Sequence, residues 1–116
     1  YSTAIFPGAL TPTEILAAWS AGADCVKVFP ASSLGGASYI RAVKAPLPHI
    51  ELLPMGGVSL ETVADYVHAG SMALGVGNDL VKISDLSEPG GATISARARD
   101  YRFRIDQARK TLDRYV

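Results

Sequence analysis

The stretch Cys25-Val26-Lys27-Val28-Phe29-Pro30 decides how this chain folds. It is apolar and rich in β-branched residues, which favours a strand, and proline marks the strand's end. Side chains alternate along a strand, so Cys25, Lys27 and Phe29 share one face and the two valines share the other. The stretch therefore predicts a buried strand that carries a single lysine amine.

The same pattern of a short apolar run followed by a helix recurs about every 23 residues along the chain. Further strands are predicted at residues 3–6, 50–53 and 72–75, each closed by a proline or glycine turn. Four strand–helix units in series predict an α/β fold with a parallel sheet and helices packed outside it. The carboxyl ends of such strands are where α/β proteins place their chemistry.

The predicted helices have clear start and stop signals. Thr11-Pro12-Thr13-Glu14 is a capping box with proline at the first helical position, and Gly22 is a natural stop. Gly35-Gly36 opens a helix that runs to about Lys44, and Ser59 is expected to cap a helix over residues 60–69. We expect a single domain over residues 1–116. Four strand–helix units occupy residues 1–82, a linker follows over residues 83–91, and a terminal helix covers residues 92–116.

The composition excludes several classes of protein. The chain has 116 residues, 48% of them hydrophobic, which argues against disorder, and no apolar run long enough for a membrane span. One cysteine and two histidines cannot build a disulfide or a zinc site, so no metal is expected. No secretory signal is visible, which favours a soluble cytoplasmic protein.

The charge is balanced overall, with 11 basic and 11 acidic residues, but the basic residues gather at the C-terminal end. Residues 92–116 hold seven basic and three acidic side chains. Asp100, Asp106 and Asp113 interrupt this surface, as in a solvated amphipathic helix. We therefore do not expect nucleic-acid binding.

Lys27 is the candidate nucleophile. An amine on the inner face of a parallel sheet loses solvent, which favours its neutral form, and a neutral amine is what imine formation with a carbonyl needs. Two structural interpretations remain open. The lysine could extend from an edge strand to water, or it could pair with a buried carboxylate.

The glycine turns after the third and fourth strands are candidate phosphate loops. They read Met55-Gly56-Gly57-Val58 and Gly75-Val76-Gly77-Asn78. Glycines let backbone amides approach an anion, and in (β/α) barrels the loops after the last two strands often bind phosphate. Two such turns in successive units are stronger evidence than either alone.

Together these motifs resemble the class I aldolases that act on 2-keto-3-deoxy-6-phosphogluconate and 2-keto-4-hydroxyglutarate. The resemblance rests on Phe6-Pro7-Gly8-Ala9, Val26-Lys27-Val28-Phe29-Pro30-Ala31, Leu53-Pro54-Met55-Gly56-Gly57-Val58 and the Gly75–Asn78 turn. It implies a homotrimeric (β/α)8 barrel without a cofactor, of which this chain resembles strands five to eight only. Lys27 would form the Schiff base, Phe29 would line its pocket, and Gly56, Gly57, Gly77 and Asn78 would bind the substrate phosphate.

The chain departs from the family pattern in three ways. Met55 stands where threonine is usual, and Asn78 where serine is expected. The first four units, which carry the general-base glutamate, an arginine and a threonine, have no counterpart here. The resemblance thus implies cleavage of the 2-keto acid to pyruvate and an aldehyde by the whole protein, and weak or no activity of this half-barrel alone.

Two alternative functions stay open. The chain could belong to another phosphate-binding barrel enzyme, such as an epimerase or a thiamine-phosphate synthase, which needs no lysine in this strand. It could also be a non-catalytic module, a half-barrel that dimerises and binds sugar phosphates without forming an imine.

Overall fold

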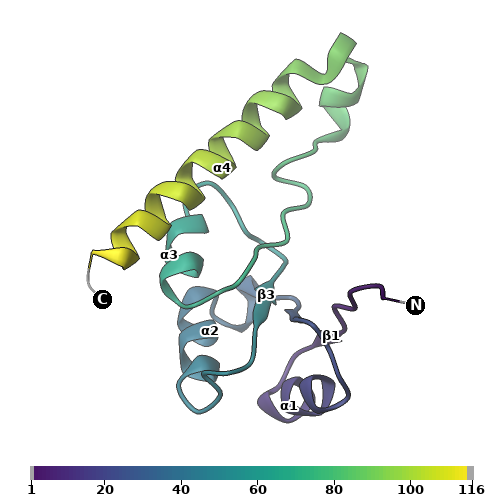
Figure 1. The fold of residues 1–116 in the computed structure, drawn as a ribbon. Coiled ribbons are helices and arrows are strands. Elements are labelled where there is room, and N and C mark those ends of the chain that lie inside the picture. The colour runs from purple at the N-terminus through teal and green to yellow at the C-terminus, as the bar shows by residue number, and fades with distance from the viewer. Residues whose placement is uncertain (1, 115–116) are drawn as a thin grey trace.

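A three-stranded parallel sheet, ordered β1-β2-β3, forms the centre of the computed structural model, which describes residues 2–114 (Figure 1). Lys27 is in register with Gly8 on one side and Leu53 on the other. The strands are β1 (Gly8–Ala9), β2 (Val26–Val28) and β3 (Leu52–Pro54). The α-helices are α1 (Pro12–Ser20), α2 (Ala37–Lys44), α3 (Val63–His68) and α4 (Ala92–Asp113), and the 3-10 helices are η1 (Ser32–Leu34), η2 (Ile83–Ser87) and η3 (Pro89–Gly91).

The helices cover one face of the sheet. The valines of β2 are fully buried in a core that also contains Ile15 of α1 and Ile40 of α2. Lys27 and Phe29 lie on the opposite face, where Lys27 is half-buried and Phe29 is 52% exposed. The predicted α/β fold with parallel strands is confirmed, and so is the alternation that separates the lysine from the valines.

The first strand was predicted too early in the chain. Residues 3–6 form no ladder, and β1 begins at Gly8. Proline did not end the pairing as expected, because the Pro7 carbonyl accepts a hydrogen bond from the Lys27 N–H at 2.9 Å. A proline at a sheet edge loses only a donor and keeps its acceptor.

The third strand is displaced in the same direction, and the predicted fourth strand is absent from the described residues. β3 includes Pro54, whose carbonyl accepts from the Gly75 N–H at 2.9 Å. Residues 72–75 run beside β3, but their only ladder contact is an isolated bridge between Met55 and Gly75. A Cβ atom at Gly75 would lie 2.7 Å from the Met55 side chain, so the two segments approach closely at this one point.

The helix after β3 is shorter than predicted. Residues 60–62 form a turn, and α3 begins at Val63, with Thr62 rather than Ser59 at the N-cap position. The Thr62 hydroxyl accepts a hydrogen bond from the Ser59 N–H at 3.0 Å and holds that turn closed. The prediction that Ser59 caps a helix over residues 60–69 is therefore wrong.

The C-terminal part was predicted correctly for the long helix but not for the linker. α4 begins at the predicted residue 92, ends at Asp113 and packs across α3 (Figure 1), and residues 115–116 of the predicted helix lie outside the described residues. The predicted linker, residues 83–91, contains η2 and η3. No helix in the described part of the chain is both long enough and apolar enough to cross a membrane.

Candidate functional site

The loops that follow β2 and β3 are joined directly to each other. The Ala31 N–H donates to the Met55 carbonyl at 2.8 Å, and the Ser32 N–H donates to the Gly56 carbonyl at 3.1 Å. These two bonds fix η1 against the first glycine turn. The strand ends therefore form one continuous rim.

A cavity of about 440 Å³ opens at this rim. It contains every residue that the sequence predicts as substrate-binding, and four more at its walls. The predicted residues are Phe29, Gly56, Gly57, Gly77 and Asn78, and the others are Met55, Val58, Ser59 and Asp79. Residues from three separate strand–helix units thus meet at one hollow, as expected for the carboxyl edge of a parallel sheet.

The first glycine turn is required by the fold itself. Gly56 and Gly57 have φ angles of +94° and +72°, which L side chains rarely adopt. A Cβ atom at Gly56 would lie 3.2 Å from the Phe29 ring, and one at Gly57 would lie 2.2 Å from the Ser32 hydroxyl. Neither position can accept a larger residue without displacing the rim.

Gly77 is a glycine that the fold does not require. Its φ angle is not positive, and a Cβ atom there would meet no other atom within 4 Å. A glycine with open space in front of it allows a ligand to approach the backbone closely. Packing therefore does not explain a glycine at position 77, whereas close approach of a ligand to its backbone would explain it.

The cavity also offers unused backbone donors. The N–H groups of Gly57 and Val58 donate no hydrogen bond to any group within residues 2–114. The same holds for the N–H groups of Gly77 and Asn78 on the facing turn. Clustered backbone N–H groups without acceptors form a site that an anion can satisfy.

Lys27 lies near this cavity without lining it. Its ammonium group is 5.5 Å from the centre of the Phe29 ring, and Phe29 forms part of the cavity wall. Its Cε atom lies 3.5 Å from where a Cβ atom on Gly8 would be. No ion pair or hydrogen bond holds its amine among the described residues, so the interpretation as a carboxylate-paired lysine gains no support.

Two polar residues at the cavity were not anticipated from the sequence. Asp79 lines the cavity, and its carboxylate accepts a hydrogen bond from the hydroxyl of Tyr101 on α4. Burial, followed by this contact with Asp79, raises the pKa of Tyr101 well above the usual range of a phenol. Tyr101 lies on the final helix, and no local signal in the sequence pairs it with a residue 22 positions earlier.

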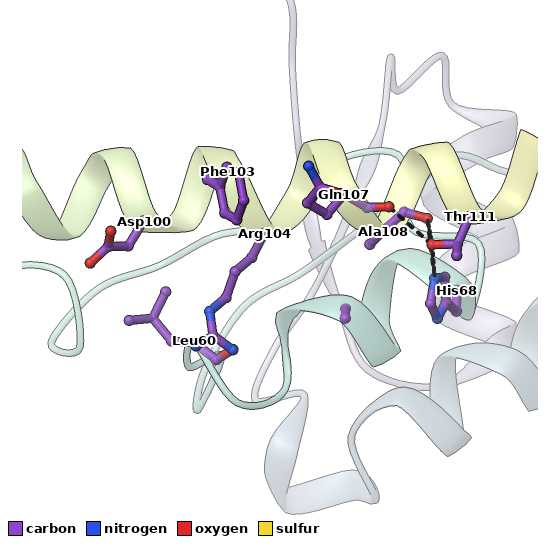
Figure 2. Close-up of a pocket in the computed structure, with 9 residues that line it drawn as sticks. Leu60, His68, Asp100, Phe103, Arg104, Gln107, Ala108 and Thr111 are labelled. Carbon is purple, nitrogen blue, oxygen red and sulfur yellow. Dashed lines mark hydrogen bonds between the residues drawn. The ribbon is translucent and has the colours of Figure 1, made fainter.

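A larger hollow, of about 690 Å³, lies between α3 and α4 and contains none of the predicted site residues (Figure 2). It is lined from one side by Leu60 and His68 and from the other by Asp100, Phe103 and Arg104. No three histidine, cysteine or acidic side chains within residues 2–114 gather closely enough to hold a metal ion. The chemistry-bearing residues are thus at the sheet edge.

The KDPG and KHG aldolase family model matches residues 1–96, which covers β1 to β3, both glycine turns and Lys27. The chain belongs to the KDPG and KHG aldolase family. A 2-dehydro-3-deoxy-6-phosphogalactonate aldolase of Escherichia coli (strain K12) is 37% identical over 103 residues, or 88% of this chain and 50% of the relative. A probable 2-dehydro-3-deoxy-6-phosphogalactonate aldolase of Rhizobium meliloti (strain 1021) is 44% identical over 95 residues, or 78% of this chain and 44% of the relative.

Solved structures agree with the family assignment. A structure described as native KDPGal superposes on 95% of this chain with a TM-score of 0.83 and 32% sequence identity. That match covers 52% of the aligned structure. The chain therefore spans about half the length of the aldolases that it matches.

Proposed function

We propose that the protein containing this chain is a class I, Schiff-base aldolase, a carbon–carbon lyase of carbohydrate metabolism, with Lys27 as its nucleophile. The observation that carries this proposal is the position of Lys27 on the uncovered face of β2, without a partner among the described residues and beside Phe29. The adjoining cavity has four unused backbone donors for the substrate phosphate. An imine-forming amine next to an anion site suits a phosphorylated 2-keto acid.

The mechanism begins when the neutral Lys27 amine attacks the C2 ketone of the substrate, and loss of water gives an iminium. The iminium accepts the electron pair of the C3–C4 bond as the C4 hydroxyl loses its proton. This step forms an aldehyde and an enamine on Lys27, and protonation and hydrolysis of the enamine release pyruvate. The base that takes the C4 proton is expected in the part of the protein that this chain lacks.

We propose further that the chain is the C-terminal half of a (β/α)8 barrel, strands five to eight. The parallel sheet, its uncovered face and the half-length match to the relatives support this assignment. The complete protein is then expected to be cytoplasmic and homo-oligomeric, a trimer by the family resemblance. The role of the chain is to supply the nucleophile and the phosphate site.

The substrate follows from the site and from the relatives. We propose a 2-keto-3-deoxy-6-phosphohexonate, which carries both the phosphate that the glycine turns would bind and the ketone that Lys27 would attack. Met55 packs against Gly75 and offers no hydroxyl to the sugar chain, and Asn78 keeps an amide donor where the family has serine. 2-Keto-4-hydroxyglutarate has no phosphate to bind at the turns and is expected to be the weaker substrate.

The test is turnover of the full-length protein with Lys27→Ala and, as a matched control, Lys110→Ala in the last turn of α4. The proposal predicts that the Lys27 variant falls to background and still binds phosphate, whereas the control keeps wild-type turnover. Retained turnover in Lys27→Ala would instead favour a phosphate-binding barrel enzyme that uses no imine. Phosphate binding without turnover in any variant would favour the non-catalytic module.

A further inference from the structure

Tyr101 contacts both glycine turns from outside the sheet. Its side chain is 4% exposed. Its hydroxyl donates its proton to the Asp79 carboxylate and lies 3.4 Å from the Val58 carbonyl. Val58 is the last residue of the first glycine turn and Asp79 directly follows the second, so one phenol contacts the end of each turn.

The sheet itself does little to fix the distance between these turns. Their segments share one isolated bridge, between Met55 and Gly75, and two backbone hydrogen bonds, from the Met72 N–H to the Leu52 carbonyl and from the Gly75 N–H to the Pro54 carbonyl. Beyond that point no backbone hydrogen bond within residues 2–114 joins residues 56–59 to residues 76–79. Their relative position must come from side chains.

A second α4 residue holds the same turn. Arg97 donates to the Leu80 carbonyl at 2.6 Å, and its guanidinium pairs with Asp85 at 2.8 Å. Leu80 in turn donates its N–H to the Gly77 carbonyl at 2.9 Å. The segment that begins at Gly77 is therefore fixed to α4 at two successive residues, Asp79 and Leu80.

α4 is in turn anchored on α3. The Arg104 guanidinium donates to the Leu60 carbonyl at 3.1 Å, and the His68 ring lies 3.1 Å from the Ala108 carbonyl. Figure 2 shows these residues facing one another across the two helices. α4 is thus held to α3 and to the turn that precedes it by two residues that follow Tyr101 on the same helix.

We propose that Tyr101 is a positioning residue, which sets the separation of the two glycine turns so that their N–H groups converge on one anion. Tyr101 lies beyond residue 96, where the family model ends. The proposal rests on the anion site of the proposed function. It adds that α4, rather than the sheet, gives this site its geometry.

The experiment compares Tyr101→Phe with Tyr66→Phe in the full-length protein. Tyr66 is also a buried tyrosine, but its hydroxyl faces Gly36. We expect Tyr101→Phe to weaken the affinity for inorganic phosphate about tenfold. We expect faster hydrogen exchange at the Ser59, Leu80 and Val81 amides, whose hydrogen bonds close the two turns.

Steady-state kinetics separate positioning from general damage. With a phosphorylated 2-keto acid, Tyr101→Phe should raise KM about tenfold and change kcat by less than about twofold, because Lys27 is untouched. Trapping of pyruvate on Lys27 by borohydride should be equal in Tyr101→Phe and wild type. Tyr66→Phe should match wild type in phosphate affinity and KM.

The outcomes distinguish this proposal from the proposed function. Wild-type phosphate affinity in Tyr101→Phe, or an equal loss in Tyr66→Phe, would overturn the positioning role even if Lys27 forms the adduct. Absence of a Lys27 adduct in the wild type would refute the aldolase mechanism, and the phosphate measurement would still decide the role of Tyr101. A wild-type protein that binds no phosphate would refute the anion site and this proposal together.

Discussion

Gly57 and Gly77 both line the cavity, but a methyl group would meet different surroundings at each. At Gly57 it would collide with Ser32 and force a side chain into a positive φ of +72°. At Gly77 it would enter open space at an ordinary φ. The first glycine is thus explained by packing, whereas packing does not explain the second.

Alanine substitutions separate these two explanations. Gly57→Ala should lower the free energy of unfolding by about 1–3 kcal/mol, from the steric overlap and the unfavourable φ. Gly77→Ala should change it by less than about 0.5 kcal/mol, but should weaken phosphate binding about tenfold, because the methyl group occupies the ligand's approach. Chemical denaturation and phosphate titration of both variants check this, and an unchanged phosphate affinity in Gly77→Ala would contradict it.

Tyr101 should make the full-length protein sensitive to alkaline pH. Its pKa is raised in the folded state above the value of about 10 that an unfolded tyrosine has. The stabilisation from its hydrogen bond is therefore fully present below about pH 10 and is lost as the pH rises above that value toward the folded pKa. Tyr101→Phe should be less stable than wild type at neutral pH, by about 1–3 kcal/mol.

That difference should shrink above about pH 10, where wild type loses the contribution that the variant never had. Denaturation midpoints of the two proteins across the alkaline range measure it. Tyr39 and Tyr66 also have raised pKa values, because burial disfavours their ionised forms, and they contribute equally to both proteins. A constant difference at all pH values would contradict the assignment.

Among the elements, α1 shows which features local sequence can predict. The capping box predicted from Thr11 and Glu14 is present, with the Glu14 carboxylate bound to the Thr11 N–H at 2.7 Å. A cap depends on residues three positions apart, so neighbouring residues determine it. The bounds of β1 and β3 depend on which partner strand is adjacent, and there the predicted bounds were wrong, by three to five residues for β1 and by one to two residues for β3.

The candidate site likewise contains residues that local sequence predicts and residues that it does not predict. Lys27 was predicted because it lies inside an apolar strand, and Phe29 and the glycine turns were predicted because they lie at strand ends. Asp79 and Tyr101 were not found as a pair, because their contact depends on how α4 packs over the rim. Which residue on the apolar side of a helix extends a hydroxyl to a distant loop depends on tertiary packing. The hydrophobic periodicity of the sequence does not determine it.

Removal of the α1 cap gives a local test of this element. Thr11→Ala should destabilise the protein by about 1 kcal/mol through loss of the N-cap oxygen.

The Thr11 and Leu10 backbone N–H groups, with the Thr11 hydroxyl, hold the pKa of Glu14 below its usual value. That contribution is present above the usual glutamate pKa and is lost as the pH falls through the lowered value, so stability should decrease on acidification, as thermal denaturation can show.

For the molecule as a whole, the exposed apolar surface agrees with the half-length match. Ile5, Phe6 and Phe29 are each about half exposed or more, and Phe29 lies on the uncovered face of the sheet. A sheet with one uncovered face and two edges is open to pairing with further strands. We propose that the remainder of the barrel covers it.

This arrangement predicts different activities for the chain and for the full-length protein. On the proposed mechanism, residues 1–116 alone would supply Lys27 and the phosphate loops but not the general base, so their turnover should be lower by about 10²- to 10⁴-fold. Assays of both with a 2-keto-3-deoxy-6-phosphohexonate, at matched folded concentrations, measure the ratio. Equal turnover would show that this half carries its own base and would remove the need for the missing units.

The most direct test of the central claim is covalent. Full-length protein is incubated with pyruvate and borohydride, digested, and its peptides are mapped by mass spectrometry, with Lys27→Ala treated in parallel. The account predicts one reduced pyruvyl adduct, located on Lys27 and absent from the variant. No adduct on Lys27, or an adduct on another lysine that survives the substitution, would contradict it.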